Sequence, residues 1–125
     1  MKHQDLSYAI IGCAMTVHQI LGNGFQEVIY QRALALELER EGISYFREFE
    51  MPIFYRGVQI GKRRVDFLIE GIFSVELKAT IELENIHLAQ GLNYLEIQNL
   101  ENGLLINFGA RSLQYKRLLN KKFSP

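Results

Sequence analysis

The stretch RVDFLIEGIFSVELK, residues 64–78, predicts two apolar strands joined by a Glu-Gly turn. Three charged residues stand at strand positions where core residues are expected, namely Asp66, Glu76 and Lys78. Because side chains alternate along a strand, Glu76 and Lys78 share one face, and an antiparallel neighbour can bring Asp66 beside them. The sequence therefore predicts that two carboxylates and one ammonium group converge at one place.

This charged group has two interpretations. Two carboxylates can hold Mg²⁺ with water completing its octahedral shell, and a neighbouring lysine can orient the water that attacks a phosphodiester. Alternatively, Glu76 and Lys78 take part in an ordinary ion pair across strands or in solvent. The surrounding strands are apolar on both faces and unpaired buried charge is costly, which favours the functional interpretation. We therefore expect a metal-dependent nuclease site that uses Mg²⁺ or Mn²⁺.

The chain as a whole has the size of one domain, which we expect to span residues 1–125. Its formal net charge is zero, so any binding to nucleic acid has to come from local basic clusters. Cys13 is the only cysteine and is expected in the core. No apolar stretch reaches the roughly twenty residues that span a bilayer, so we expect a cytoplasmic protein without a membrane partner.

One basic cluster lies directly before Asp66 and consists of Lys62, Arg63 and Arg64. These side chains are candidates for contacts with nucleic-acid phosphates, because they precede the expected site in the chain. The alternative is a solvated strand edge without a binding role.

Apolar periodicity and turn residues predict an α/β (α+β) fold. Helices are predicted at residues 6–21, from a capping box at Asn23 and Gln26 to about residue 41, and from a cap at Asn85 to about residue 99. Strands are predicted at residues 43–50, 53–60, 64–69, 72–79, 104–108 and 113–119, with breaks at Pro52, Arg56-Gly57, Gly61 and Gly71. The expected order is therefore helix, helix, four strands, helix and two strands.

This order, with an acid before a turn and Glu-x-Lys on the next strand, resembles the PD-(D/E)XK nuclease superfamily. Residues 24–30, GFQEVIY, also fit the pattern that names the GxxExxY protein family, which is similar to that superfamily. The later segments 75–79, 89–95 and 103–109 resemble the same family. Four such segments in order are more specific than any one of them. The resemblance implies a restriction-endonuclease-like core, with a central mixed sheet of about five strands flanked by helices.

The resemblance also implies roles for residues at matching positions. Asp66 and Glu76 correspond to the metal ligands, and Lys78 corresponds to the lysine that positions the attacking water. The sequence departs from the superfamily pattern at Val65, where the proline of the motif is absent. That proline is the loosest element of the motif, and the carboxylate is the group that does the chemistry.

Three further residues are implied by the resemblance. Glu27 matches the acidic residue of the first core helix, while Gln90 and Tyr94 match a Gln-x-x-x-Tyr element of RecB-type nucleases. Glu27 falls in the first turn of its helix, where a stabilising surface charge is the alternative. Gln90 and Tyr94 are four residues apart and share a helix face, where a polar seam against the sheet is the alternative.

Two histidines, His18 and His87, are interpreted as structural, because lone histidines on helices are usually satisfied by local contacts. The expected partner is nucleic acid, DNA in preference to RNA. A catalytically silent module that binds nucleic acid or a protein is the alternative. The apolar first helix also suggests a homodimer.

Overall fold

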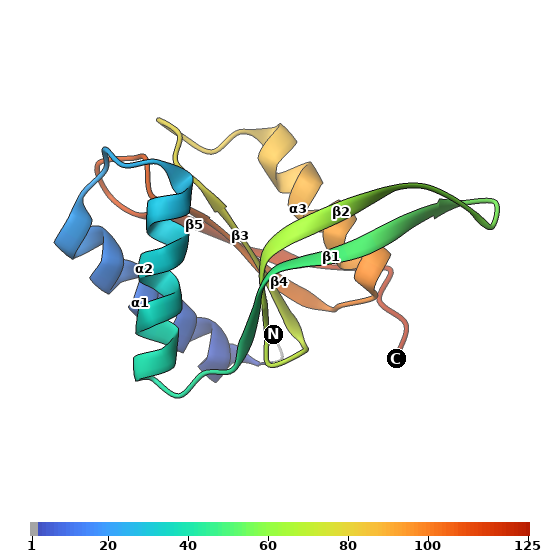
Figure 1. Cartoon of the computed structure of the whole chain (residues 1–125), viewed down its shortest axis with the longest axis horizontal. Coiled ribbons are helices and arrows are strands. Elements are labelled where there is room, and N and C mark those ends of the chain that lie inside the picture. The colour runs from blue at the N-terminus through green and yellow to red at the C-terminus, as the bar shows by residue number, and fades with distance from the viewer. Residues whose placement is uncertain (1–2) are drawn as a thin grey trace.

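A computed structural model of the chain describes residues 3–125 (Figure 1). Its elements are α1 (Gln4–Leu21), α2 (Glu27–Arg40), β1 (Tyr45–Tyr55), β2 (Val58–Ile69), β3 (Phe73–Lys78), α3 (Asn85–Gln98), β4 (Asn102–Asn107) and β5 (Gln114–Leu119). The strands form one sheet in the order β1-β2-β3-β4-β5. Within residues 3–125 only the β3–β4 pair is parallel, because α3 provides the crossover between these two strands. The predicted mixed five-stranded sheet flanked by helices is confirmed.

Three strands precede α3, not the four that the sequence predicted. The predicted break at Pro52 is wrong, because β1 runs through this residue. Proline is tolerated here since β1 is an edge strand and needs donors on one side only. The turn between β1 and β2 consists of Arg56 and Gly57, both with positive φ (50° and 80°), as a two-residue hairpin requires. The predicted break at Gly61 is also absent, and β2 continues to Ile69.

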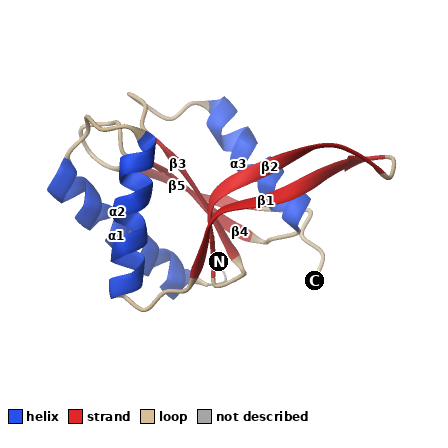
Figure 2. Ribbon diagram, viewed as in Figure 1, coloured by secondary structure: helices blue, strands red, loops and turns tan. Residues whose placement is uncertain are grey.

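The sheet separates two apolar cores. Helices α1 and α2 lie side by side on one side of the strands, and α3 lies on the other (Figure 2). The larger core lies under α1 and α2 and contains Ile10, Cys13, Tyr30, Leu34, Phe67, Phe73, Val75, Leu77 and Phe108. The smaller core lies under α3 and contains Val65, Leu68, Tyr94, Leu95, Leu100, Leu105 and Leu118. Burial of these side chains supplies most of the force that holds the helices on the sheet.

The first helix buries one face and exposes Tyr8, Met15 and Ile20. Cys13 is buried, as expected. No helix within residues 3–125 is long and apolar enough to cross a membrane.

The two predicted side-chain caps are wrong. Gln26 is the N-cap of α2 and makes no side-chain capping bond, so Asn23 does not form a capping box with it. Glu84, not Asn85, is the N-cap of α3, and the Glu84 N–H donates to Nδ1 of His87 at 3.1 Å. His87 therefore has a structural role at the start of α3.

The long β1–β2 ribbon bends at Glu48 and Asp66. Glu48 has φ 55°, and the strand register passes from Arg47–Phe67 to Phe49–Val65 without a pair between them. Phe67 packs in the core under α1 and α2, whereas Val65 packs in the core under α3. Side chains two residues apart on a regular strand share a face, so β2 must twist at Asp66. Beyond this twist the ribbon leaves the sheet, and we call residues 49–65 the arm (Figure 1).

Candidate active site

Asp66 lies where β2 separates from β3. The two strands pair only over residues 67–69 of β2, and beyond them Oδ2 of Asp66 accepts a hydrogen bond from the Leu77 N–H at 2.7 Å. Its other oxygen, Oδ1, accepts a bond from Nε2 of Gln31 on α2 at 2.8 Å. The carboxylate therefore accepts a backbone N–H of β3 that a carbonyl of β2 would accept in a regular antiparallel pair. The hydrogen bonds from Leu77 and Gln31 together fix its orientation.

Gln31 was missed by the sequence analysis. It is a buried polar side chain on the face of α2 that otherwise packs Tyr30, Leu34 and Leu38. Buried amides are kept where they have partners, and the partner here is Asp66. The only signal in the sequence was a glutamine among the apolar positions of that helix.

Glu76 and Lys78 lie on β3, on the face opposite Val75 and Leu77 of the core under α1 and α2. Glu76 is 8% exposed and Lys78 is half-buried. Within residues 3–125 the Lys78 ammonium has no hydrogen bond or ion pair. A half-buried ammonium group without such a partner is available to a ligand or a water molecule.

Burial raises the pKa values of both carboxyl groups, and charge repulsion adds to the rise at Glu76. Burial first, and then the charge of Asp66, raises the pKa of Glu76 to about 7, while Arg63 and Lys78 oppose this rise. Burial also raises the pKa of Asp66, against the hydrogen bonds from Leu77 and Gln31. Such coupling requires that the groups lie close to one another. The structure therefore brings Asp66, Glu76 and Lys78 into one electrostatic cluster.

Glu27 joins this cluster from the first turn of α2. Partial burial and then the negative charge of Asp66 raise its pKa, and Lys78 and His87 lower it. The hydroxyl of Tyr30 fixes the chain before Glu27: it accepts the N–H groups of Gly24 and Phe25 at 3.0 and 3.1 Å and donates to the Gly22 carbonyl. The Gly, Glu and Tyr of the GxxExxY pattern thus form one local unit.

This arrangement predicts the effect of Tyr30→Phe. The tyrosine ring would still stack on Phe108, at 4.7 Å between centroids, but three backbone groups would lose their partner. We expect a loss of about 1–3 kcal/mol in the free energy of unfolding, measured by urea denaturation. Tyr55→Phe, at an exposed tyrosine, is the matched control and should change little. Equal stability of both variants would contradict the role given to the hydroxyl.

Arg63 lies inside the site. Its Nη2 donates to Oε1 of Glu76 at 3.2 Å and to the backbone carbonyl of Gln90 at 3.0 Å. The twist at Asp66 explains this position, because it turns Arg63 and Val65 towards α3. Arg63 is half-buried, whereas Lys62 and Arg64 are exposed. The basic cluster of the sequence is therefore divided between the site and the surface.

Gln90 and Tyr94 lie on the face of α3 that covers the site. Tyr94 is fully buried, and within residues 3–125 its hydroxyl has no hydrogen-bond partner. Burial and then the charge of Glu76 raise the pKa of Tyr94 to about 12, so the hydroxyl is close to that carboxylate. An unpaired buried hydroxyl is costly. A water molecule or a ligand beside Glu76 would satisfy it.

The carboxylates fit a divalent cation in their chemistry. Asp66 and Glu76 offer hard oxygen donors that repel each other, and a cation between them would remove the repulsion. Within residues 3–125 no group of three or more His, Cys, Asp or Glu side chains is arranged as a metal site. Mg²⁺ usually keeps several waters and needs only one or two carboxylates, so this donor set suits it.

Asn107 fixes the chain that follows Lys78. Its Oδ1 accepts the N–H groups of Thr80 and Gly109 at 2.9 and 3.0 Å. Its Nδ2 donates to the Thr80 carbonyl and to Oε1 of Gln114, both at 3.0 Å. A side chain at Gly109 would meet the Thr80 backbone at 2.3 Å. The segment 103–109 therefore supports the end of β3 that carries Lys78.

The second histidine, His18, has its Nε2 2.9 Å from the Ala110 carbonyl. This contact joins α1 to the loop after β4 and gives His18 a structural role.

Comparisons with known proteins agree with the fold. A search of curated proteins found no significant match. The solved crystal structure of SSO0001 is similar with a TM-score of 0.60 and 20% sequence identity, over 74% of this chain and 49% of that one. This chain thus spans about half the length of that protein, and the likeness concerns the fold.

The family comparison covers nearly the whole chain. The model of the PD-(D/E)XK nuclease superfamily matches residues 4–118, which include all the elements from α1 to nearly the end of β5. The finer assignment to the GxxExxY family, on Gly24, Glu27 and Tyr30, stays a prediction. The match and the fold together show that this chain belongs to the PD-(D/E)XK nuclease superfamily.

Proposed function

We propose that this protein is a metal-dependent nuclease that hydrolyses phosphodiester bonds in nucleic acid, DNA in preference to RNA. One observation carries the proposal. Three carboxyl groups have raised pKa values, and each interacts electrostatically with another of them or with Lys78. They belong to Asp66, Glu76 and Glu27, which come from three different elements. Perturbed carboxyl groups gathered around a lysine are typical of functional sites and are costly to keep for structure alone.

Each residue has a role that its position supports. Asp66 and Glu76 would hold Mg²⁺ or Mn²⁺, which supplies Lewis-acid activation and neutralises charge that develops on the phosphoryl oxygens. Asp66 is oriented for this by Leu77 and Gln31. The Lys78 ammonium would orient and polarise the attacking water, since it has no competing ion pair within residues 3–125.

Four further residues surround the two metal ligands and Lys78. Glu27 would hold a water molecule on the α2 side of the site. Gln90 and the Tyr94 hydroxyl would contact a water or a phosphate oxygen from the α3 side, which would satisfy the unpaired hydroxyl. Arg63 ties Glu76 to the backbone of α3 and so positions this carboxylate.

A second candidate function is a silent module that binds nucleic acid without cleaving it. The Arg63–Glu76 ion pair favours it, because the guanidinium already neutralises Glu76 without a cation. Such a module would bind nucleic acid equally well with and without divalent metal and would cleave none.

Cleavage assays distinguish the two functions. We expect single-stranded and duplex DNA to be cleaved with Mg²⁺ or Mn²⁺, but not with EDTA and not by Asp66→Asn. Asp5→Asn, at an exposed aspartate of α1, is the matched control and should cleave as the wild type does. Cleavage by Asp66→Asn at the wild-type rate, with the fold checked by circular dichroism, would refute the proposed site.

A further inference from the structure

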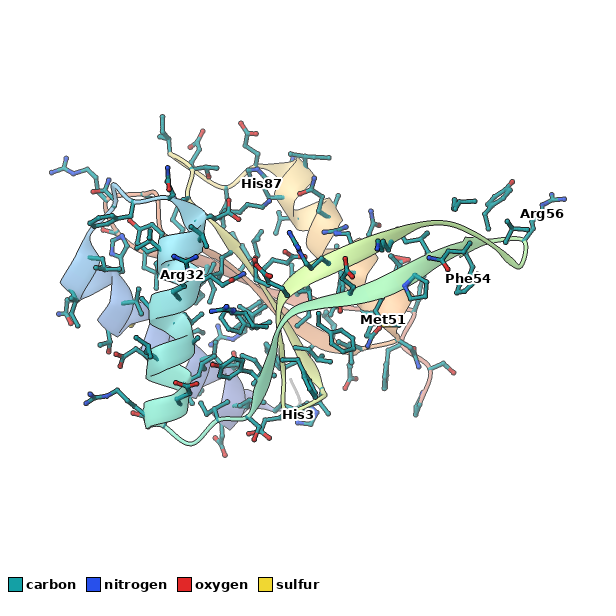
Figure 3. The ribbon with its side chains drawn as sticks, viewed as in Figure 1. His3, Arg32, Met51, Phe54, Arg56 and His87 are labelled. Carbon is teal, nitrogen blue, oxygen red and sulfur yellow. The ribbon has the colours of Figure 1, made fainter. Side chains whose placement is uncertain are left out.

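The far end of the arm exposes four large apolar side chains. Phe54, Tyr55, Val58 and Ile60 are 61–65% exposed. Phe54 and the neighbouring Arg56 lie at the end of the ribbon that points away from the helices (Figure 3). Nothing in residues 3–125 covers these side chains. Phe54 and Tyr55 are consecutive on β1, so they point to opposite faces of the ribbon. Large apolar side chains exposed on a projecting ribbon are typical of a binding surface.

The base of the arm, next to the sheet, packs against the core under α3, whereas within residues 3–125 the end near the turn makes no such contacts. Phe49 and Met51 of β1 pack against the core under α3, together with Val65 of β2. Because a two-stranded ribbon alone is only marginally stable in water, these contacts set the direction of the arm. The arm therefore presents its apolar end at a defined distance from the site.

The charge of the arm matches a polyanion. Residues 49–65 contain four basic side chains and one acidic side chain, whereas the whole chain has no net charge. The Cζ atom of Arg56 lies over the Tyr55 ring, 5.9 Å from its centroid. Lys62 and Arg64 are exposed along β2. The single acidic residue, Glu50, is 4.0 Å from Lys62, and both side chains are largely exposed, so this pair is weak.

The arm and the site share one strand. Strand β2 begins with Val58 at the arm end and reaches Asp66 eight residues later, which corresponds to roughly 26 Å in an extended strand. A strand of nucleic acid bound along β2 would therefore lead from the arm directly to the carboxylates.

We propose that the arm binds a single-stranded flank of the nucleic-acid substrate, with a base stacked on Phe54 and phosphates contacted by Lys62 and Arg64 on the same face of the ribbon. Tyr55 and Arg56 offer a second ring and a second cation at the end of the ribbon. Exposed aromatic rings beside basic side chains are the combination that holds unpaired bases, since any base can stack on a ring. This inference rests on the proposed function for the identity of the substrate. It adds a second contact, roughly 26 Å along β2 from the position of cleavage.

Binding without cleavage tests the arm separately from catalysis. Fluorescence anisotropy would compare labelled 20-nucleotide and 3-nucleotide single-stranded DNA, in EDTA and at low salt. We expect Phe54→Ala combined with Tyr55→Ala to weaken binding of the long strand at least tenfold. Binding of the short strand should change less than twofold, because it is too short to occupy both the arm and the site.

A matched control removes exposed apolar side chains elsewhere. Ile20→Ala combined with Leu36→Ala, at positions 74% and 61% exposed on α1 and α2, should bind both strands as the wild type does. Arm-dependent binding without any cleavage would support the arm while refuting the proposed nuclease function. Equal binding of the long strand by the arm variant and the wild type would overturn the inference. The inference would also be overturned if sedimentation showed that the wild type is a dimer and the arm variant a monomer, while both bound DNA equally well.

Discussion

Replacement of Lys78 by alanine is expected to lower the rate of DNA cleavage by about 10²- to 10⁴-fold while the fold is retained. The Lys78 ammonium has no ion pair in residues 3–125 and is free to orient the attacking water, which would lose this group in the variant. Cleavage would be measured at saturating Mg²⁺, with circular dichroism and thermal unfolding as checks on the fold.

The matched control for this experiment is Lys121→Ala, at an exposed lysine after β5. This variant should cleave as the wild type does. Undiminished cleavage by Lys78→Ala would mean that another group positions the water, and the assignment of Lys78 would be wrong.

Replacement of Glu76 by glutamine is expected to stabilise the folded protein at high pH. The pKa of Glu76 is about 7 in the folded state, against an ordinary value of 4.5 for an exposed glutamate. Between these values the folded state holds the proton and the unfolded state has lost it, so stability falls as the pH rises from 4.5 to 7. The full loss, of up to about 3 kcal/mol, is present above pH 7 and is absent below the unfolded pKa.

Glutamine carries no charge and can still accept the hydrogen bond from Arg63. Urea denaturation should therefore show Glu76→Gln and the wild type to be equally stable at pH 4, with the variant more stable at pH 8. Glu82→Gln, at an exposed glutamate, is the control and should follow the wild type at both pH values. A Glu76→Gln variant less stable than the wild type at pH 8 would show that the ion pair with Arg63 outweighs the burial of this carboxylate.

The elements of the fold were largely predictable because they depend on local patterns. The apolar periodicity of α1 and the alternation around the Glu-Gly turn give the helix and the β2–β3 hairpin directly. The break predicted at Pro52 was wrong because a proline disrupts a strand only where its missing N–H is needed, and the position of β1 at the sheet edge is a property of the whole sheet.

The candidate site was predictable only in part, for a similar reason. The spacing of Glu76 and Lys78 on one strand is local, so their shared face follows from the sequence. The position of Arg63 depends on the twist at Asp66, which is accompanied by a positive φ at Glu48 on the neighbouring strand. Nothing in the residues around Arg63 indicates this twist. The contact of Gln31 with Asp66 joins residues 35 positions apart and depends on how α2 packs on the sheet.

The metal site formed by Asp66 and Glu76 can be tested directly by calorimetric titration with Mn²⁺ and Mg²⁺ at pH 8, where Glu76 is mainly ionised. The wild type, Asp66→Asn, Glu76→Gln and the control Asp5→Asn would be titrated without nucleic acid. We expect that the wild type and Asp5→Asn bind Mn²⁺, while each of the two site variants loses at least tenfold in affinity. Absence of binding by the wild type, or equal binding by all four proteins, would contradict a metal site formed by Asp66 and Glu76.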